Sequence, residues 1–155
     1  MRKILVGMVC LFLIVSTASA EERWLVNDGF GSGGTAFYQQ GFVSTEIMAS
    51  KFSPDPGDYP CQIKKINTLV QDGTGGSTIG AFVLHIWEDN GGTAPGPSLF
   101  TESFQLQAGD AFNEIDLTAE NIVIQSGDFR VGLEFVLDPP PSFCRDADGI
   151  NSQTN

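Results

Sequence analysis

Apolar and polar residues alternate along short runs of this chain, and no long segment repeats them with the period of an α-helix. The clearest run is 128–138, in which every second residue from Phe129 to Leu137 is apolar. A period of two predicts a strand with one buried face and one more polar face. The run 78–89 carries apolar groups on both faces, which is typical of a central strand. Further runs of this kind lie at 41–52, 61–70, 98–106, 111–117 and 121–125.

Glycine, proline, asparagine and aspartate separate these runs. Pro95 and Pro97 lie in the segment 89–98, where their missing backbone N–H groups prevent strand pairing. About seven to eight short strands with frequent turns predict an all-β fold, an antiparallel sandwich of two sheets. We expect this sandwich at 41–138, after a Gly-rich segment at 21–40. A Pro-rich and acidic tail at 139–155 is expected to pack on it.

Residues 1–20 have the pattern of a signal peptide. Arg2 and Lys3 precede an apolar stretch at 4–15, and Ala18-Ser19-Ala20 supplies a small-residue cleavage site. The apolar stretch is shorter than the roughly 20 residues that a membrane-spanning helix needs. We therefore expect a secreted protein, extracellular or periplasmic, that begins at Glu21 and has no membrane partner after cleavage.

Acidic residues dominate the charge of the chain. It has 19 acidic and 8 basic residues, and removal of residues 1–20 takes two of the basic ones, which leaves a formal net charge near −13. A field of that sign repels phosphate backbones and anionic lipids, so nucleic acids and membrane surfaces are poor partners. Solubility outside the cell explains such acidity, and cation binding is the alternative interpretation.

Two of the three cysteines, Cys61 and Cys144, remain after cleavage. In an oxidising compartment an isolated pair predicts a disulfide bond. The bond would close a loop of more than eighty residues and stabilise the fold by about 4–5 kcal/mol in the chain-entropy description. Two thiols, or an intermolecular pair, are the alternatives.

Short motifs in the second half of the chain follow one another in a recognisable order. The sequence Ile86-Trp87-Glu88-Asp89 is followed by one long turn with Gly91-Gly92 and Pro95-Gly96-Pro97, then by NEIDL at 113–117 and SGDFRVGL at 126–133. This order resembles the jelly-roll-like β-sandwich domains of secreted bacterial proteins, which are often appended to extracellular proteases and surface proteins. The resemblance covers about residues 42–148. It implies an accessory role without catalytic residues, and a further strand after the acidic turn near the end of the chain.

Catalytic machinery is poorly represented. His85 is the only histidine, and its neighbours on the strand face are Val83 and Trp87, so a Ser-His-Asp device is not expected. A Gly-x-Gly-x-x-Gly pattern at 29–34 lacks the following helix that dinucleotide binding requires, so we expect no organic cofactor. A glycan-active hydrolase remains an alternative, because four carboxylates on predicted strands could supply a catalytic pair: Glu102, Glu114, Asp116 and Glu134.

These patterns favour a non-catalytic accessory or interaction module whose partner is an extracellular polysaccharide or protein. Carbohydrate is a specific candidate, because sandwich domains stack exposed aromatic rings on sugars and bond the hydroxyls with polar side chains. The candidate ligand-binding residues are His85 and Trp87. The alternative for Trp87 is packing within the second sheet face or under a loop. Neither the ligand nor the oligomeric state is specified by the sequence.

The acidic tail contains a candidate structural calcium site. Asp146, Asp148 and Asn151 offer three side chains with oxygen atoms, whereas Ca²⁺ takes six to eight oxygen ligands. The EF-hand pattern is not met, because the glycine of this turn follows two residues too early. A calcium site would need ligands from another loop, such as Glu88 or Asp89. The alternative is an acidic turn in which an aspartate caps backbone N–H groups.

Overall fold

The computed structural model describes residues 21–26, 36–71, 79–107, 109, 112–136 and 141–146. The expected signal peptide at 1–20 and the glycine pattern at 29–34 lie outside these residues. None of the described residues belongs to a helix long and apolar enough to cross a membrane.

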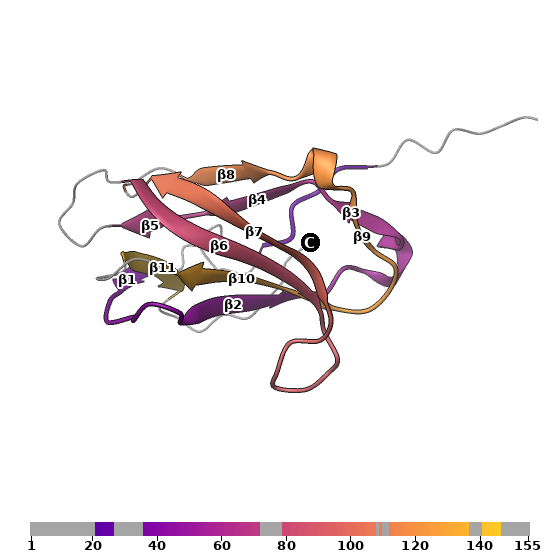
Figure 1. Ribbon diagram of the computed structural model, residues 1–155. Helices are drawn as coiled ribbons and strands as arrows, with labels where there is room; N and C mark the ends of the chain where they lie inside the picture. Colours follow the sequence, from indigo (N-terminus) through magenta and orange to yellow (C-terminus); the bar gives the residue numbers. More distant parts are fainter. Residues whose placement is uncertain are drawn as a thin grey trace, which may run out of the picture.

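Strands make up most of the described chain, and the only helical elements are two short 3₁₀ turns (Figure 1). The strands are β1 Ala36–Gln39, β2 Ile47–Phe52, β3 Cys61–Ile63, β4 Lys65–Thr68, β5 Val70–Gln71, β6 Ile79–Glu88, β7 Ser98–Gln107, β8 Asn113–Asp116, β9 Ile122–Ile124, β10 Phe129–Phe135 and β11 Ser142–Asp146. The 3₁₀ turns are η2 Pro56–Asp58 and η3 Thr118–Glu120. Because every strand pair is antiparallel, the predicted all-β, antiparallel fold class is confirmed.

The largest sheet has four strands in the order β2-β10-β6-β7. Its central strands β6 and β10 are the two runs with the clearest alternation in the sequence, and both are paired on their two sides. Strand pairs β3–β9 and β4–β8 lie on the other side of the molecule, and β1-β11-β5 forms a further small sheet (Figure 1). Strands β1 and β11 fall outside the segment 41–138, for which the alternation predicted the sandwich.

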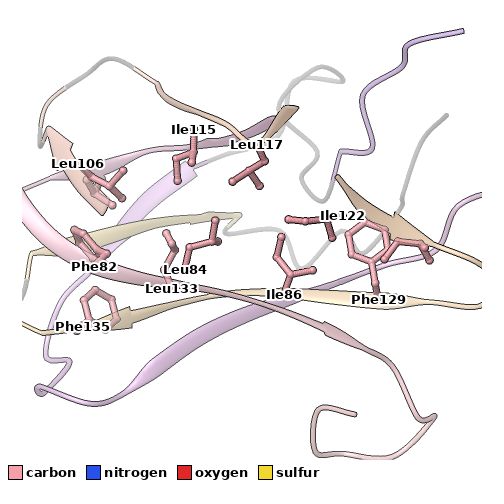
Figure 2. Close-up of a cluster of buried hydrophobic side chains, with 12 residues drawn as sticks. Phe82, Leu84, Ile86, Leu106, Ile115, Leu117, Ile122, Phe129, Leu133 and Phe135 are labelled. Carbon is pink, nitrogen blue, oxygen red and sulfur yellow. The ribbon is translucent and has the colours of Figure 1, made fainter. Parts of the chain in front are cut away.

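The hydrophobic core lies between these layers (Figure 2). The inward residues of β6 are fully buried, with Phe82, Leu84 and Ile86 each at 0 % exposure. The register sets Leu84 beside Leu133 and Phe82 beside Phe135, which is also buried. The facing layer contributes four more buried side chains, Ile115, Leu117, Ile122 and Ile124. The inward side chains of β6 are buried in the core, so only its outward side chains are available to contact a ligand.

The expected disulfide bond between Cys61 and Cys144 is wrong, because the two side chains are not joined to each other. Cys61 begins β3, whereas Cys144 lies in β11, where its backbone N–H donates to the carbonyl of Leu69 at 3.2 Å. Strands β3 and β11 lie towards opposite ends of the molecule in Figure 1. Eight residues of extended chain, as between Cys61 and Leu69, span roughly 26 Å. A disulfide needs Cα atoms within about 7 Å of each other.

Candidate functional site

The side of the four-stranded sheet that is turned away from the core is called the outer face here. Since Phe82, Leu84 and Ile86 point into the core, the intervening residues His85 and Trp87 point to the outer face. The register of the neighbouring strands adds their partners on the same face: Gly132 and Thr101 opposite His85, and Arg130 opposite Trp87. The two predicted ligand-binding residues are therefore brought together on one accessible surface.

His85 is held between two neighbouring strands. Its Nε2 lies 2.8 Å from Oε2 of Glu134 on β10, and its Nδ1 lies 3.2 Å from Oγ1 of Thr101 on β7. A carboxylate only accepts hydrogen bonds, so Nε2 carries a hydrogen and donates it to Glu134. The His85 side chain is 14 % exposed. These contacts fix the plane of the imidazole across the sheet, which makes it a rigid part of the outer face.

The Trp87 indole stacks on this fixed imidazole. The ring centroids are 4.9 Å apart and the planes differ by 4°. A second boundary comes from Gly132, because a Cβ built there would meet Cζ3 of Trp87 at 2.8 Å and Cγ2 of Ile47 at 2.9 Å. The edge of the indole therefore rests on the backbone of β10. Trp87 packs on the outer face and remains partly exposed, with one ring face covered by His85.

An irregularity in the strand pairing places two hydroxyl groups beside these rings. The register of β6 with β7 shifts between Ile86 and Trp87, so that Ser98 pairs with Trp87. Residues three apart on a regular strand point to opposite faces. Here the shift brings Ser98 and Thr101 together, with their hydroxyl oxygens 3.3 Å apart. Both residues are exposed. The outer face thus combines an aromatic stack with hydroxyl and carboxylate groups at its border.

Arg130 fixes the loop that follows β6. Its Nε donates to Oδ1 of Asp89 at 2.7 Å, its Nη1 to the carbonyl of Thr93 at 3.0 Å and its Nη2 to the carbonyl of Gly92 at 2.6 Å. The side chain of Asp89 is only 3 % exposed. A carboxylate and two carbonyl oxygens are the type of ligand that a hard metal ion takes. In this loop the guanidinium supplies the positive charge.

Lys51 and Asp128 extend this network at the edge of the outer face. Lys51 Nζ lies 3.0 Å from Oδ2 of Asp128 and 3.9 Å from Oδ2 of Asp89. The pKa of Asp128 is lowered, first by a hydrogen bond with the Ser53 side chain and second by the hydrogen bond with Lys51. Both aspartates of this network therefore meet cationic side chains in the folded protein.

The predicted calcium ligands lie elsewhere. Asp148 and Asn151 are outside the described residues, and Asp146 is the last residue of β11, with only its backbone described. Asp89, offered as a further ligand, is instead bonded to Arg130. In the described part of the chain, no group of three His, Cys, Asp or Glu side chains is placed to hold a metal ion. The structure thus gives the calcium prediction no additional ligand at Asp89.

The four carboxylates considered for hydrolysis lie on different faces. Glu134 is on the outer face, where it is bonded to His85. Glu114 and Asp116 flank the buried Ile115 and are exposed on the opposite layer. Glu102 pairs with the inward residue Leu84, at the edge of the four-stranded sheet. This arrangement does not direct them to a common cleft.

The sequence singled out His85 and Trp87, but not the residues that position them. Glu134, Gly132 and Arg130 share the polar face of run 128–138, and this alternation is the signal that places them together. Their pairing with β6 depends on the order of the strands in the sheet.

Comparisons of the chain with known protein families, with curated proteins and with solved structures find no match.

Proposed function

We propose that this protein is a secreted, non-catalytic binding module that takes an uncharged carbohydrate on the outer face of the four-stranded sheet. The observation that carries the proposal is the Trp87–His85 stack, which lies on the outer face instead of in the core. A flat, partly exposed aromatic surface fits the apolar face of a pyranose ring. The hydroxyl groups of Ser98 and Thr101 at its border suit the hydroxyls of a sugar.

Rigidity supports this proposal. Binding costs conformational entropy when side chains must be ordered, so a surface fixed before binding loses less affinity. His85 is bonded on both ring nitrogens, and Trp87 is held between His85 and the backbone at Gly132. The strongly acidic composition favours an uncharged ligand over an anionic polysaccharide, because like charges repel.

The strand order supports the resemblance to jelly-roll-like accessory domains. If β3, β4 and β5 count as one interrupted strand and β8 with β9 as another, the chain has eight strands. The four-stranded sheet then has the order second, seventh, fourth, fifth. The other layer has the order first, eighth, third, sixth. An eight-strand arrangement of two interlocked Greek keys is the jelly-roll architecture.

The test is retention of the purified protein on uncharged polysaccharides, namely cellulose, xylan, mannan and chitin, with the anionic polysaccharide alginate as a comparison. We expect retention on at least one uncharged polysaccharide, and loss of that retention in Trp87→Ala. Trp24→Ala is the matched control, because it removes the other tryptophan, which is 52 % exposed on the N-terminal segment. Equal retention of Trp87→Ala and the parent would contradict the proposal, as would retention on alginate alone or no retention at all.

A further inference from the structure

The loop 89–97 lies beside Trp87, and a side chain of another strand, Arg130 of β10, holds its conformation. Residues 90–95 are all exposed, and the segment contains three glycines and two prolines. Backbone bonds close its base, from Gly96 N–H to the carbonyl of Glu88 at 2.9 Å and from Glu88 N–H to the carbonyl of Pro97 at 3.0 Å. Beyond this base, the Arg130 guanidinium binds the loop at Asp89, Gly92 and Thr93.

The position of Arg130 decides where the loop lies. Arg130 is directly opposite Trp87 in the register, so both side chains rise from the outer face. The carbonyl groups that Arg130 binds must therefore lie above this face. In Figure 1 the loop between β6 and β7 projects on the side of the four-stranded sheet that is turned away from β3, β4 and β8.

His85 precedes Trp87 by two residues and covers one face of the indole. Strand β6 ends at Glu88, so the loop begins two residues after Trp87, on the side of Trp87 along the chain that is away from His85. We propose that the loop 89–97 is one wall of the carbohydrate site and that Arg130 is the residue that positions this wall. This inference rests on the proposed function, and it adds Arg130 and the loop backbone as determinants of which saccharide fits beside Trp87.

The substitution Arg130→Lys separates charge from geometry. Lysine keeps the positive charge, but its single ammonium group lacks the planar fork that binds three separated acceptors. We expect faster hydrogen exchange of the backbone amides of 90–95, measured by mass spectrometry. We also expect affinity for the best-retained polysaccharide to fall by about tenfold or more. Arg23→Lys is the matched control, because Arg23 forms its ion pairs with Asp55 and Asp58, away from the loop.

Deletion of residues 92–95 provides a second variant, which removes the wall and keeps Arg130. Both variants are compared with the parent at a temperature at which circular dichroism shows them folded. If Arg130→Lys does not fold, the deletion alone decides, and unchanged affinity in it overturns the inference. Unchanged affinity of Arg130→Lys with a loosened loop also overturns it. Reduced affinity with an unchanged loop assigns Arg130 to direct ligand contact, and overturns the positioning role.

The same measurements separate this inference from the proposed function. If the parent binds and Trp87→Ala does not, but both loop variants bind like the parent, the carbohydrate site stands and the wall is rejected. If the parent retains no uncharged polysaccharide, the proposed function and the wall are rejected together.

Discussion

Gly132 lies under the edge of the Trp87 indole, so close that a Cβ atom on Gly132 would meet Cζ3 and Cη2 of that ring at 2.8 and 2.9 Å. The same Cβ would meet Ile47 at 2.9 Å. Carbon atoms attract each other best at about 3.5–4.0 Å. A side chain at position 132 therefore displaces Trp87, Ile47 or the backbone of β10, and the position of the indole depends on this glycine.

Substitution of Gly132 by alanine is expected to lower the free energy of unfolding by about 1–3 kcal/mol, the usual cost of overpacking. Urea unfolding gives the measurement. Gly57→Ala is the matched control, since a Cβ on Gly57 has nothing within 4 Å. The double substitution Gly132→Ala with Trp87→Ala should recover part of the loss. Equal stability of Gly132→Ala and the parent would show that Trp87 does not depend on Gly132 for space.

Replacement of Arg130 by methionine is expected to destabilise the protein by about 3 kcal/mol, because it leaves the carboxylate of Asp89 buried without its main partner. Lys51 Nζ, 3.9 Å from Oδ2 of Asp89, remains as a second cationic partner. The expected loss of stability therefore lies at the lower end of the range for an unpaired buried charge. Lys65→Met is the control. It breaks an exposed pair with Glu114, which should cost about 0–1 kcal/mol. The denaturant midpoints of the two variants measure their losses of stability. Equal losses would contradict the claim that the burial of Asp89 makes the Arg130 pair the more important one.

The pKa of Asp128 predicts a pH dependence. This pKa is lowered by the Ser53 hydrogen bond and by Lys51, so the folded state favours the ionised carboxylate. The stabilisation is present above the unfolded-state pKa of about 3.9 and is lost as the pH falls through the lower folded-state pKa. Asp128→Asn should therefore reduce stability at neutral pH by at most about 1 kcal/mol.

The stability difference between Asp128→Asn and the parent should shrink as the pH falls below the unfolded-state pKa of about 3.9, and disappear once the pH is below the lowered folded-state pKa of Asp128. Thermal melting over a series of pH values from neutral to strongly acid measures it. Glu102→Gln, which neutralises an exposed carboxylate of β7, serves as the comparison. If the stability difference between Asp128→Asn and the parent persists unchanged in acid, it comes from the shape of the side chain instead of its charge.

The separation of Cys61 from Cys144 predicts that reducing agent leaves the stability unchanged. The thermal midpoint of the protein should be the same with and without dithiothreitol. Cys61→Ser combined with Cys144→Ser should lower the stability by the sum of the two single losses, because the effects of distant sites add. A midpoint that falls on reduction, or a loss in the double variant that is smaller than that sum, would indicate that the two cysteines are joined.

Alternation in the sequence determined the fold class, because a period of two fits only a strand. The buried face of β10 and the location of His85 and Trp87 on one face of β6 follow from this alternation in runs 128–138 and 78–89, whereas the burial of Phe82, Leu84 and Ile86 decided that this face is the outward one. Strand β11 was not predicted, because its few apolar residues stand among charged ones in a Pro-rich tail. The disulfide bond was predicted wrongly for a related reason, since composition counts cysteines but holds no information on their distance.

The tertiary structure alone decided what surrounds Trp87. The order β2-β10-β6-β7 brings Gly132, Glu134 and Arg130 next to β6 from more than forty residues away in the sequence. The register shift beside Trp87 turns Ser98 and Thr101 to one face, which regular alternation excludes. Local periodicity specifies which face of a strand a side chain occupies, because that depends on its own backbone. Its neighbours across the sheet depend on the packing of the whole core.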